Sequence, residues 1–254
     1  MCCGIYLTLI KENFVEVKNS RVAILFDIDD TLLVNVIAFQ RVLNENYGLD
    51  LTLDEAIARY KAFRNQADVL HTLLNAKPYN DLAYRGARTR WEMTLDELGY
   101  PNNPAQCDRL EDIYHQYQKE IKLVPCVEEA LLNLSQKDVL LGIISNGKTK
   151  AQRAKCDQMD IYRFMNPSMV FISESLGISK PHRECFEKVL AQLPESVEEI
   201  YFVGDNFKND IAPCKQFGIK PIWIDRHYDE TKDSSGVIVC NSSQELADVL
   251  NNLI

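Results

Sequence analysis

The stretch that most constrains this chain of 254 residues is RVAILFDIDDTLL, residues 21–33. Its five apolar residues, 22–26, lead directly into the carboxylates Asp27, Asp29 and Asp30. A short, unbroken apolar run that is rich in branched residues predicts a strand buried on both faces, as in a parallel sheet. Because ligands bind just beyond the carboxyl ends of such strands, we expect Asp27 and Asp29 to lie in the functional site.

The spacing of Asp27 and Asp29 also predicts a metal site. Side chains alternate between the two faces of a strand, so these two carboxylates share one side while Ile28 points away. Carboxylates that close repel each other, and a divalent cation relieves the repulsion. Hard oxygen ligands suit Mg²⁺, which is therefore the expected cofactor.

The composition argues against several other classes of protein. Contents of 46% hydrophobic and 26% charged residues are ordinary for a globular protein. The net charge of −9 and the lack of a basic stripe disfavour nucleic acid as a partner, and no apolar run is long enough to span a bilayer. The N-terminus lacks the basic segment of a signal peptide, and the eight cysteines contain no C-x-x-C pair. We therefore expect a cytoplasmic protein with reduced thiols and no membrane partner.

Beyond residue 122, helical and strand patterns alternate along the chain. Apolar runs predict strands at 139–144, 169–172, 200–203, 221–224 and 237–239, after the first at 22–26. Helical patterns fall between them at 127–134, 148–159, 181–192, 211–217 and 245–253. This alternation predicts an α/β fold with a doubly wound, mostly parallel sheet. Residues 1–20 form an N-terminal extension, whose alternating residues predict a small hairpin at a sheet edge.

Residues 34–121 have a different pattern, with apolar residues at helical spacing and no strand-like stretch. One predicted helix starts at Val36 and ends at Gly48, and the next starts at Thr52, whose T-x-x-E sequence is a capping box. Further helices are predicted at 68–75, 82–98 and 104–119. The chain thus divides into the extension, a core of residues 21–33 and 122–254, and an inserted all-helical domain of residues 34–121.

Polar side chains follow three of the predicted strands, and one lysine precedes a predicted helix: Asp27 and Asp29, Ser145 and Asn146, Asp205, and Lys180. Together they offer carboxylates for a metal, hydroxyl and N–H groups for anion oxygens, and a fixed cation. This is the set of groups that binds a phosphoryl group and neutralises it during transfer. One carboxylate can attack phosphorus, and a second can protonate the leaving oxygen and then activate water.

Each of these motifs taken alone also fits an ordinary turn, because Asp, Asn, Ser and Gly are common turn formers. Residues 27–31 do not form a calcium-binding EF-hand loop, because the later Gly and Glu of that loop are missing. The glycine-rich loops of nucleotide-binding folds are missing as well. The order of the four motifs, three of which end an apolar strand, favours one shared site over four unrelated turns.

The four motifs together resemble those of the haloacid dehalogenase (HAD) superfamily of phosphohydrolases. FDIDDTL resembles its first motif, D-x-D-x-T, and ISNG its second. Lys180 in GISKP resembles the third motif, and VGDNFKND the fourth. The helical insertion, residues 34–121, resembles the C1-type cap of this family and is called the cap below. The stretch from ISNG to GDNFKND is also similar to pyrimidine 5′-nucleotidases and N-acylneuraminate-9-phosphatases.

The resemblance implies that Asp27 is the nucleophile and Asp29 the acid and base. It implies that Mg²⁺ is held by the Asp27 carboxylate, the Asp29 main-chain carbonyl and Asp205. The expected function is that of a Mg²⁺-dependent phosphatase of small phosphorylated metabolites, of the nucleoside monophosphate or sugar phosphate class. The reaction would pass through an aspartyl-phosphate.

The same resemblance implies roles for five further residues. Ser145, Lys180 and the Asn146 backbone would bind the phosphoryl oxygens. Thr31 would order the loop after the nucleophile, and Asp210 would support the metal site through water or through Lys180. The partner is then a small phosphate ester, and the protein a monomer or a homodimer.

Two other functions fit the same residues. Dehalogenases on this scaffold lack the second Asp of the first motif, so Asp29 favours phosphoryl transfer over dehalogenation. A phosphomutase keeps both Asp residues and stays an alternative. A binding module without turnover is the third hypothesis, but the intact Asp27, Asp29, Lys180 and Asp205 argue against it.

The cap offers candidates for substrate selection. Arg85 and Arg88 are three residues apart and share a helix face, close to Trp91. One hypothesis is that Arg85, Arg88 or Arg90 binds an acidic or phosphorylated substrate while Tyr84 or Trp91 stacks on a ring. The other is a solvated helix face with Trp91 in the core of the cap, which is the commoner outcome for charged helices. The segment Asp225-Arg226-His227 follows a strand that we expect at the sheet edge, and therefore outside the site.

Overall fold

The computed structural model describes the backbone of residues 15–73, 81–227 and 232–254, and the side chains of residues 15–64, 88–227 and 232–254. A single sheet of six strands has the order β3-β2-β1-β4-β5-β6. All neighbouring strands pair in parallel. The strands are β1 (Val22–Phe26), β2 (Val139–Ser145), β3 (Val170–Ile172), β4 (Glu199–Gly204), β5 (Lys220–Ile224) and β6 (Ile238–Cys240). The predicted parallel α/β sheet is confirmed.

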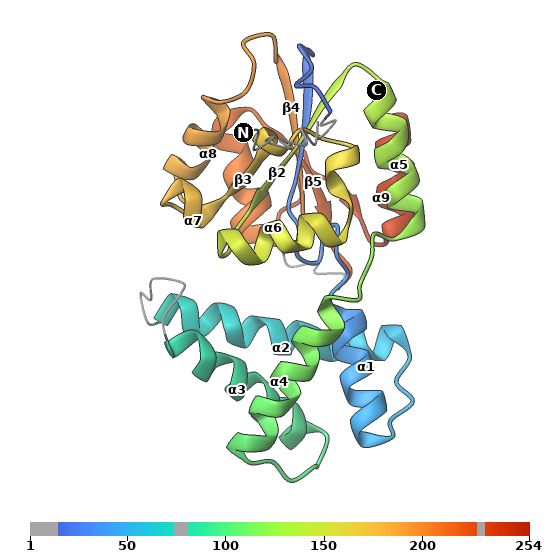
Figure 1. The fold of residues 1–254 in the computed structure, drawn as a ribbon, viewed down its shortest axis with the longest axis vertical. Coiled ribbons are helices and arrows are strands. Elements are labelled where there is room, and N and C mark those ends of the chain that lie inside the picture. The colour runs from blue at the N-terminus through green and yellow to red at the C-terminus, as the bar shows by residue number, and fades with distance from the viewer. Residues whose placement is uncertain (1–14, 74–80, 228–231) are drawn as a thin grey trace, which may run out of the picture.

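Strand β1 lies in the middle of the sheet, between β2 and β4. Its alternate side chains enter two separate apolar cores. Ile24 and Phe26 pack with residues of α5 (Pro125–Gln136) and α9 (Ser243–Asn252). Ala23 and Leu25 pack with residues of α8 (Arg183–Leu190) on the opposite face. Helices therefore cover both faces of the sheet (Figure 1), which explains why β1 is apolar at every position.

The remaining core elements are short. They include α6 (Thr149–Gln158) and α7 (Ser173–Leu176), and two 3₁₀ turns at Ile161–Arg163 and Pro167–Met169. The helix predicted at 211–217 is instead a π-helical turn at Phe207–Ile211 followed by a 3₁₀ turn at Ala212–Phe217. Pro213 explains part of the difference, because it lacks the N–H that an α-helix would use there.

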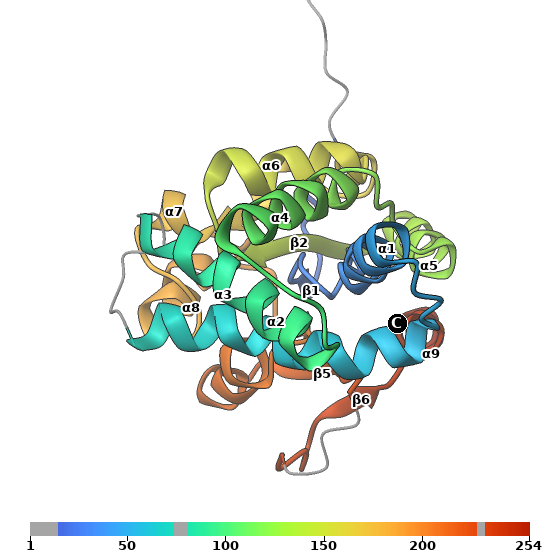
Figure 2. The ribbon, with the colours of Figure 1, turned by 90° about the horizontal axis from the view of Figure 1, so that it is seen from below.

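The cap is helical wherever the structure describes it. Its helices are α1 (Val36–Tyr47), α2 (Leu53–Leu73), α3 (Asp81–Glu97) and α4 (Pro104–Gln118), and they lie together below the sheet (Figures 1 and 2). The predicted capping box opens α2: the Thr52 backbone N–H donates to Glu55 Oε2 at 2.8 Å, and the Glu55 N–H donates to Thr52 Oγ1 at 3.3 Å. Helix α2 runs on to Leu73, so the two helices predicted at 52–63 and 68–75 are one.

The N-terminal extension differs from its prediction. Residues 1–14 lie outside the described residues, and residues 15–19, where the second arm of the hairpin was predicted, form no strand. Side chains of other elements hold this segment instead. Asn166 Nδ2 donates to the Val15 carbonyl at 2.6 Å, and Lys18 Nζ donates to the Ser135 carbonyl at 2.6 Å. None of the described helices is both long and apolar enough to cross a membrane.

Candidate active site

The carboxyl ends of three adjacent strands carry the residues that the sequence singled out. Asp27 directly follows β1, Ser145 is the last residue of β2, and Asp205 directly follows β4. The Asp27 N–H donates to the Val203 carbonyl of β4 at 2.9 Å, which extends the sheet pairing up to the carboxylate. The strand order reverses direction around β1, and at such a switch point a crevice opens for ligands.

Lys180 lies between two of the carboxylates. Its Nζ is 2.7 Å from Asp27 Oδ1 and 2.7 Å from Asp210 Oδ1, and the three side chains are no more than 9% exposed. Asn146 fixes the loop that carries the lysine: its Nδ2 donates to the Lys180 carbonyl and its Oδ1 accepts from the Lys180 N–H, both at 2.9 Å. Burial would lower the pKa of Lys180, but the carboxylates of Asp210 and Asp27 outweigh burial and raise it.

We call Asp27, Asp205, Asp210 and Lys180 the Asp27 cluster. Carboxylate oxygens of its three acidic residues lie within 4.8 Å of one another. Burial raises the pKa of Asp27 to about 7, with Lys180 opposing and Asp210, Asp205 and Asp29 adding to the rise. A Cβ at position 204 would stand 2.5 Å from Asp210 Cβ, so only Gly204 admits this carboxylate. The cluster thus holds an excess of buried negative charge and hard oxygen donors, which fits a site for Mg²⁺.

Asp29 has a separate set of partners, which we call the Asp29 cluster: Asp29, Lys155, Gln152 and Asn35. Lys155 Nζ lies 2.6 Å from Asp29 Oδ1 and 2.7 Å from Oδ2. Gln152 Nε2 donates to Oδ2 at 3.0 Å, and Asn35 Nδ2 donates to Oδ1 at 2.8 Å. Burial would raise the pKa of Asp29, but the charge of Lys155 and these hydrogen bonds lower it to about 2.

Sequence reasoning missed the partners of Asp29. One signal was available: Gln152 and Lys155 are three residues apart on α6, the helix that begins just after Ser145-Asn146-Gly147. Residues at this spacing share a helix face, so both could have been expected to face the same strand end. The role of Asn35 had no such signal, because it follows from the turn that leads into the cap.

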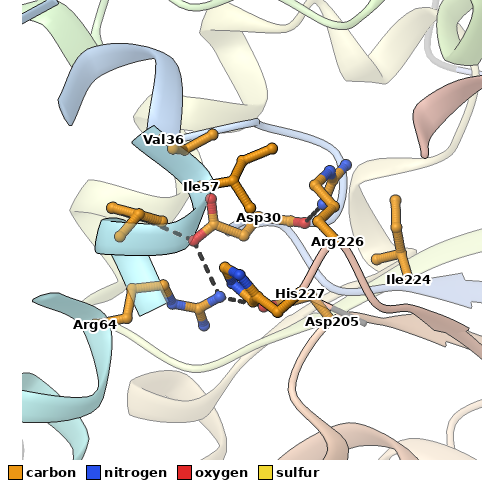
Figure 3. A pocket seen from close by; sticks show the side chains of 9 residues that line it. Asp30, Val36, Ile57, Arg64, Asp205, Ile224, Arg226 and His227 are labelled. Carbon is orange, nitrogen blue, oxygen red and sulfur yellow. Dashed lines mark hydrogen bonds and ion pairs between the residues drawn. The ribbon is translucent and has the colours of Figure 1, made fainter. Parts of the chain in front are cut away.

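A third group of contacts joins the cap to the core through Asp30 (Figure 3). From the cap, Tyr60 donates its hydroxyl to Asp30 Oδ2 at 3.2 Å, and the Arg64 guanidinium lies 3.2 Å from the same oxygen. Arg64 also forms an ion pair with Asp205. An arginine of the cap thus contacts a carboxylate of the Asp27 cluster.

The expectation that the segment Asp225-Arg226-His227 lies outside the site is wrong for Arg226 and His227. Arg226 donates to the main-chain carbonyl of Asp30, and Arg226 and His227 line a pocket together with Arg64 and Asp205 (Figure 3). The reason is the sheet topology: β6 lies beyond β5, so β5 is not an edge strand and its end points to the cap.

Comparison with known proteins decides the family. The sequence model of the haloacid dehalogenase-like hydrolases matches residues 22–218. The chain belongs to this family. The resemblance drawn from the four motifs is thereby confirmed, and the protein is a hydrolase.

Its relatives include enzymes named as phosphatases. A glyceraldehyde 3-phosphate phosphatase of Methanocaldococcus jannaschii is 33% identical over 131 residues, a match that spans 51% of this chain and 57% of that relative. The pyrimidine 5′-nucleotidase PynA of Streptococcus pneumoniae is 25% identical over 91% of this chain and 95% of its own length. The crystal structure of the HAD-hydrolase YfnB of Bacillus subtilis has a TM-score of 0.62 at 24% identity, and covers 91% of this chain and 99% of that one.

Several buried polar atoms of the site have no hydrogen-bond partner among the described residues, and two of them are hydroxyls of the HAD motifs. The side-chain oxygens of Ser145 and Thr31 are buried and have no hydrogen-bond partner within the part of the chain that the structure describes. A buried hydroxyl without a partner costs free energy unless a ligand completes it. Ser145, at the end of β2, is placed where a ligand oxygen could do so.

Arg85, Arg88 and Trp91 of the cap were the residues predicted to select the substrate. Trp91 is fully buried in the cap and its indole N–H donates to Glu111 Oε2 at 2.8 Å. Arg88 pairs with Asp108 of α4, at 2.9 and 2.6 Å. The side chain of Arg85 lies outside the described residues. These contacts of Trp91 and Arg88 join helices of the cap, which favours the structural interpretation over stacking and binding of a substrate.

Proposed function

We propose that this hydrolase is a Mg²⁺-dependent phosphatase of small phosphorylated metabolites, of the nucleoside monophosphate or sugar phosphate class. The observation that carries the proposal is the buried Lys180 ammonium, 2.7 Å from both Asp27 and Asp210. A fixed cation beside a carboxylate, at the end of the central strand, can neutralise a phosphoryl group while it is transferred. The names of the relatives, glyceraldehyde 3-phosphate phosphatase and pyrimidine 5′-nucleotidase, support small phosphate esters as substrates.

Asp27 is the proposed nucleophile and Asp29 the proposed acid and base. An Asp27 oxygen forms a bond to phosphorus while the bond from phosphorus to the leaving oxygen breaks, and the protonated Asp29 gives that oxygen its proton. In the proposed complex with Mg²⁺ and the ester, Asp27 is therefore ionised and Asp29 protonated, the reverse of the pKa order in the metal-free structure. Water then attacks the phosphorus of the aspartyl-phosphate and gives a proton to Asp29. The bond to Asp27 breaks, phosphate leaves, and both carboxyl groups return to their starting states.

Three residues are proposed to hold the phosphoryl oxygens through both steps. Lys180 supplies a charged donor, the Ser145 hydroxyl a neutral one, and the Asn146 backbone an N–H group. The buried Ser145 hydroxyl, which has no partner among the described residues, supports this role. The two hydrogen bonds between Asn146 and Lys180 support a shared function of the two loops, because they hold the donors in one arrangement.

The proposed holders of Mg²⁺ are the carboxylates of Asp27 and Asp205 and the main-chain carbonyl of Asp29. Asp210 would support them through Lys180. The grouping of carboxylate oxygens within 4.8 Å supports this assignment, since Mg²⁺ prefers hard oxygen ligands. When bound, Mg²⁺ supplies positive charge that stabilises the negative charge of the transferring phosphoryl group.

Phosphate release from p-nitrophenyl phosphate tests the proposal. The native protein and Asp27→Asn are assayed with Mg²⁺ and with EDTA. We expect release that needs Mg²⁺ and that falls by about 10⁴-fold or more in Asp27→Asn, because the variant lacks the nucleophile. A screen of nucleotides and sugar phosphates would then identify the substrate.

Release that persists in EDTA or in Asp27→Asn would contradict the mechanism. No release from the native protein on any ester of the screen would contradict a phosphatase. Transfer of the phosphoryl group within a sugar phosphate, with little free phosphate, would show a phosphomutase instead.

A further inference from the structure

Cap and core meet at a small pocket beside the Asp27 cluster (Figure 3). Its free space is about 20 Å³, which is enough for a water-sized group. Three of its lining side chains are apolar, and six can form hydrogen bonds: Asp30, Tyr60, Arg64, Asp205, Arg226 and His227. The pocket therefore suits one small polar group of a ligand rather than a ring.

Asp205 belongs both to this pocket and to the Asp27 cluster. A carboxylate oxygen of Asp205 lies within 4.8 Å of carboxylate oxygens of Asp27 and Asp210. The same carboxylate forms an ion pair with Arg64 Nη1. A phosphoryl group bound at Asp27 would thus be separated from the Arg64 guanidinium by a single side chain, and a short carbon chain on that phosphoryl group can reach the pocket.

Most hydrogen-bonding groups of the pocket already have partners. Arg226 donates from Nη1 to the Asp30 main-chain carbonyl and from Nη2 to Ser243 Oγ, the latter at 3.2 Å. The Asp30 carboxylate accepts from the Asn35 N–H at 2.9 Å and from the Tyr60 hydroxyl at 3.2 Å. These contacts hold the wall of the pocket and leave few of its groups for a ligand.

Arg64 and His227 are the exceptions. Arg64 contacts Asp30 and Asp205 through Nη1, and its Nε and Nη2 have no hydrogen-bond partner in the part of the chain that the structure describes. The His227 backbone N–H donates to Asp225 Oδ1 at 3.1 Å, but its ring has no hydrogen-bond partner among the same residues. A guanidinium and an imidazole both offer N–H donors, and the planar fork of the former matches the two oxygens of a carboxylate.

The charge of the pocket depends on Asp205. Arg64 and Arg226 balance the carboxylates of Asp30 and Asp205, so the four side chains together are neutral. Under the proposed function Asp205 is also a ligand of Mg²⁺, and the same pocket then has an excess of positive charge. Coulomb attraction would favour an anion beside Arg64 in that state.

We propose that this pocket is a subsite for a carboxylate of the substrate, with Arg64 as the residue that selects it and His227 as a second donor. The inference rests on the proposed function and narrows its substrate class. Among small phosphate esters, it favours sugar phosphates and related short-chain esters that carry a carboxylate over nucleotides, which do not. The small volume of the pocket favours a carboxylate over a second, bulkier phosphoryl group.

A purely structural link between cap and core is the alternative role for Arg64. Its side chain is 23% exposed, whereas those of Asp30 and Asp205 are 9% and 10% exposed, so the guanidinium reaches from the solvent side into the site. A structural link would affect all ligands alike, because its loss changes only the hold of the cap on the core. A subsite distinguishes a ligand that has a carboxylate from one that does not.

The test measures the binding of two phosphonates, which have no ester bond and are not hydrolysed. The ligand 3-phosphonopropionate ends in a carboxylate, and propylphosphonate has a methyl group in its place. Calorimetric titration of the native protein at saturating Mg²⁺ gives the Kd of each. We expect 3-phosphonopropionate to bind about tenfold more tightly, because hydrogen bonds between charged groups are the stronger ones.

Variants of α2 locate the effect. Arg64→Met should bring the two Kd values within about twofold of each other, and Arg64→Lys should keep part of the preference, because the cation stays but the planar fork is lost. Arg59→Met is the matched control on the same helix, where Arg59 Nε lies 3.7 Å from Glu97, and it should keep the native ratio. The ratio of the two Kd values cancels any change in affinity for Mg²⁺. If Arg64→Met does not fold, Arg64→Gln replaces it.

Equal Kd values in the native protein, or a native ratio in Arg64→Met, would overturn the inference. If that result comes with Mg²⁺-dependent hydrolysis of p-nitrophenyl phosphate, the inference alone fails and the proposed function stands. If neither phosphonate binds and no ester is hydrolysed, the proposed function fails and the inference with it.

Discussion

The Asp27 cluster and the Asp29 cluster are centred on residues only two positions apart, yet their charge balance is opposite. In the Asp27 cluster Lys180 pairs with two of the three carboxylates and Arg64 of the cap pairs with the third, and burial together with the neighbouring carboxylates raises the pKa of Asp27 to about 7. In the Asp29 cluster one carboxylate has one lysine and two amides, which outweigh burial and lower its pKa to about 2. The first cluster has more carboxylates than cations, whereas in the second the one carboxylate has a lysine of its own.

The two clusters therefore differ in their expected affinity for a cation and in how firmly their central carboxylate is oriented. A cluster with too much negative charge is stabilised by a cation or a protonated state, which suits a place where Mg²⁺ and a phosphoryl group meet. A cluster whose donors fill every lone pair of its carboxylate has a defined geometry before any ligand arrives. The charge balance of the Asp27 cluster therefore suits a bound cation, whereas the Asp29 carboxylate is held in one orientation by its donors.

The largest expected effect concerns the two lysines and the free energy of unfolding. We expect Lys180→Met to lower it by about 3–5 kcal/mol, because two buried carboxylates lose their cation. Lys155→Met should cost less than about 1 kcal/mol, because its pair is partly exposed. Urea unfolding of both variants in EDTA, followed by circular dichroism, measures the difference. If both variants lost the same free energy of unfolding, the difference in burial between the two lysines would not determine their contributions to stability.

An intermediate effect concerns pH in the absence of metal. Between pH 4 and 7, roughly, folded Asp27 holds a proton that the unfolded chain has released, so its contribution to stability falls as pH rises. Asp29 acts in the opposite direction: its contribution is present above about pH 4 and is lost as pH falls toward 2. The expected changes in the free energy of unfolding are on the order of 4 kcal/mol for Asp27 and 1 kcal/mol for the partly exposed Asp29.

The measurement is the difference in unfolding free energy between native protein and each of Asp27→Asn and Asp29→Asn, in EDTA, at a series of pH values. Subtraction removes the titration of the groups that do not interact with the substituted residue. Differences that change with pH in the same direction for both variants would contradict the comparison of the two clusters.

The smallest expected effect concerns Arg64, which places a guanidinium of the cap on Asp205. Because Arg64 and Mg²⁺ would use the same carboxylate, we expect Arg64→Met to lower the Kd for Mg²⁺ about fivefold. Calorimetric titration measures the Kd, and the fluorescence of Trp223, whose indole donates to the Asp205 carbonyl at 2.9 Å, gives a second signal.

Arg59→Met is the matched control, because Arg59 lies on the same helix and its Nε is 3.7 Å from Glu97 of the cap. This variant should bind Mg²⁺ as the native protein does. An unchanged or raised Kd in Arg64→Met would show that the cap arginine and the metal do not compete, and that the Asp27 cluster can satisfy both.

Much of the fold was predictable because its signals are local. The run at 22–26 is apolar at every position, which only a strand covered on both faces requires, and the structure places it in the middle of the sheet. The capping box at Thr52 was predictable for the same reason, since its two hydrogen bonds join residues three apart. The hairpin expected in the N-terminal extension was wrong in its described part, because short alternating segments carry too weak a signal.

The sequence by itself determined which groups stand at the strand ends, because a strand's direction carries Asp27, Ser145 and Asp205 to one edge of a parallel sheet. Only the tertiary structure decided the pKa of each carboxyl group and the side chains that contact it. Asp27 and Asp29 are chemically identical, yet burial raises the pKa of Asp27 against the opposing charge of Lys180, whereas Lys155 and the neighbouring amides lower the pKa of Asp29 against burial. Both lysines lie more than a hundred residues further along the chain. Burial and partner distance depend on the packing of distant segments, and no local pattern records them.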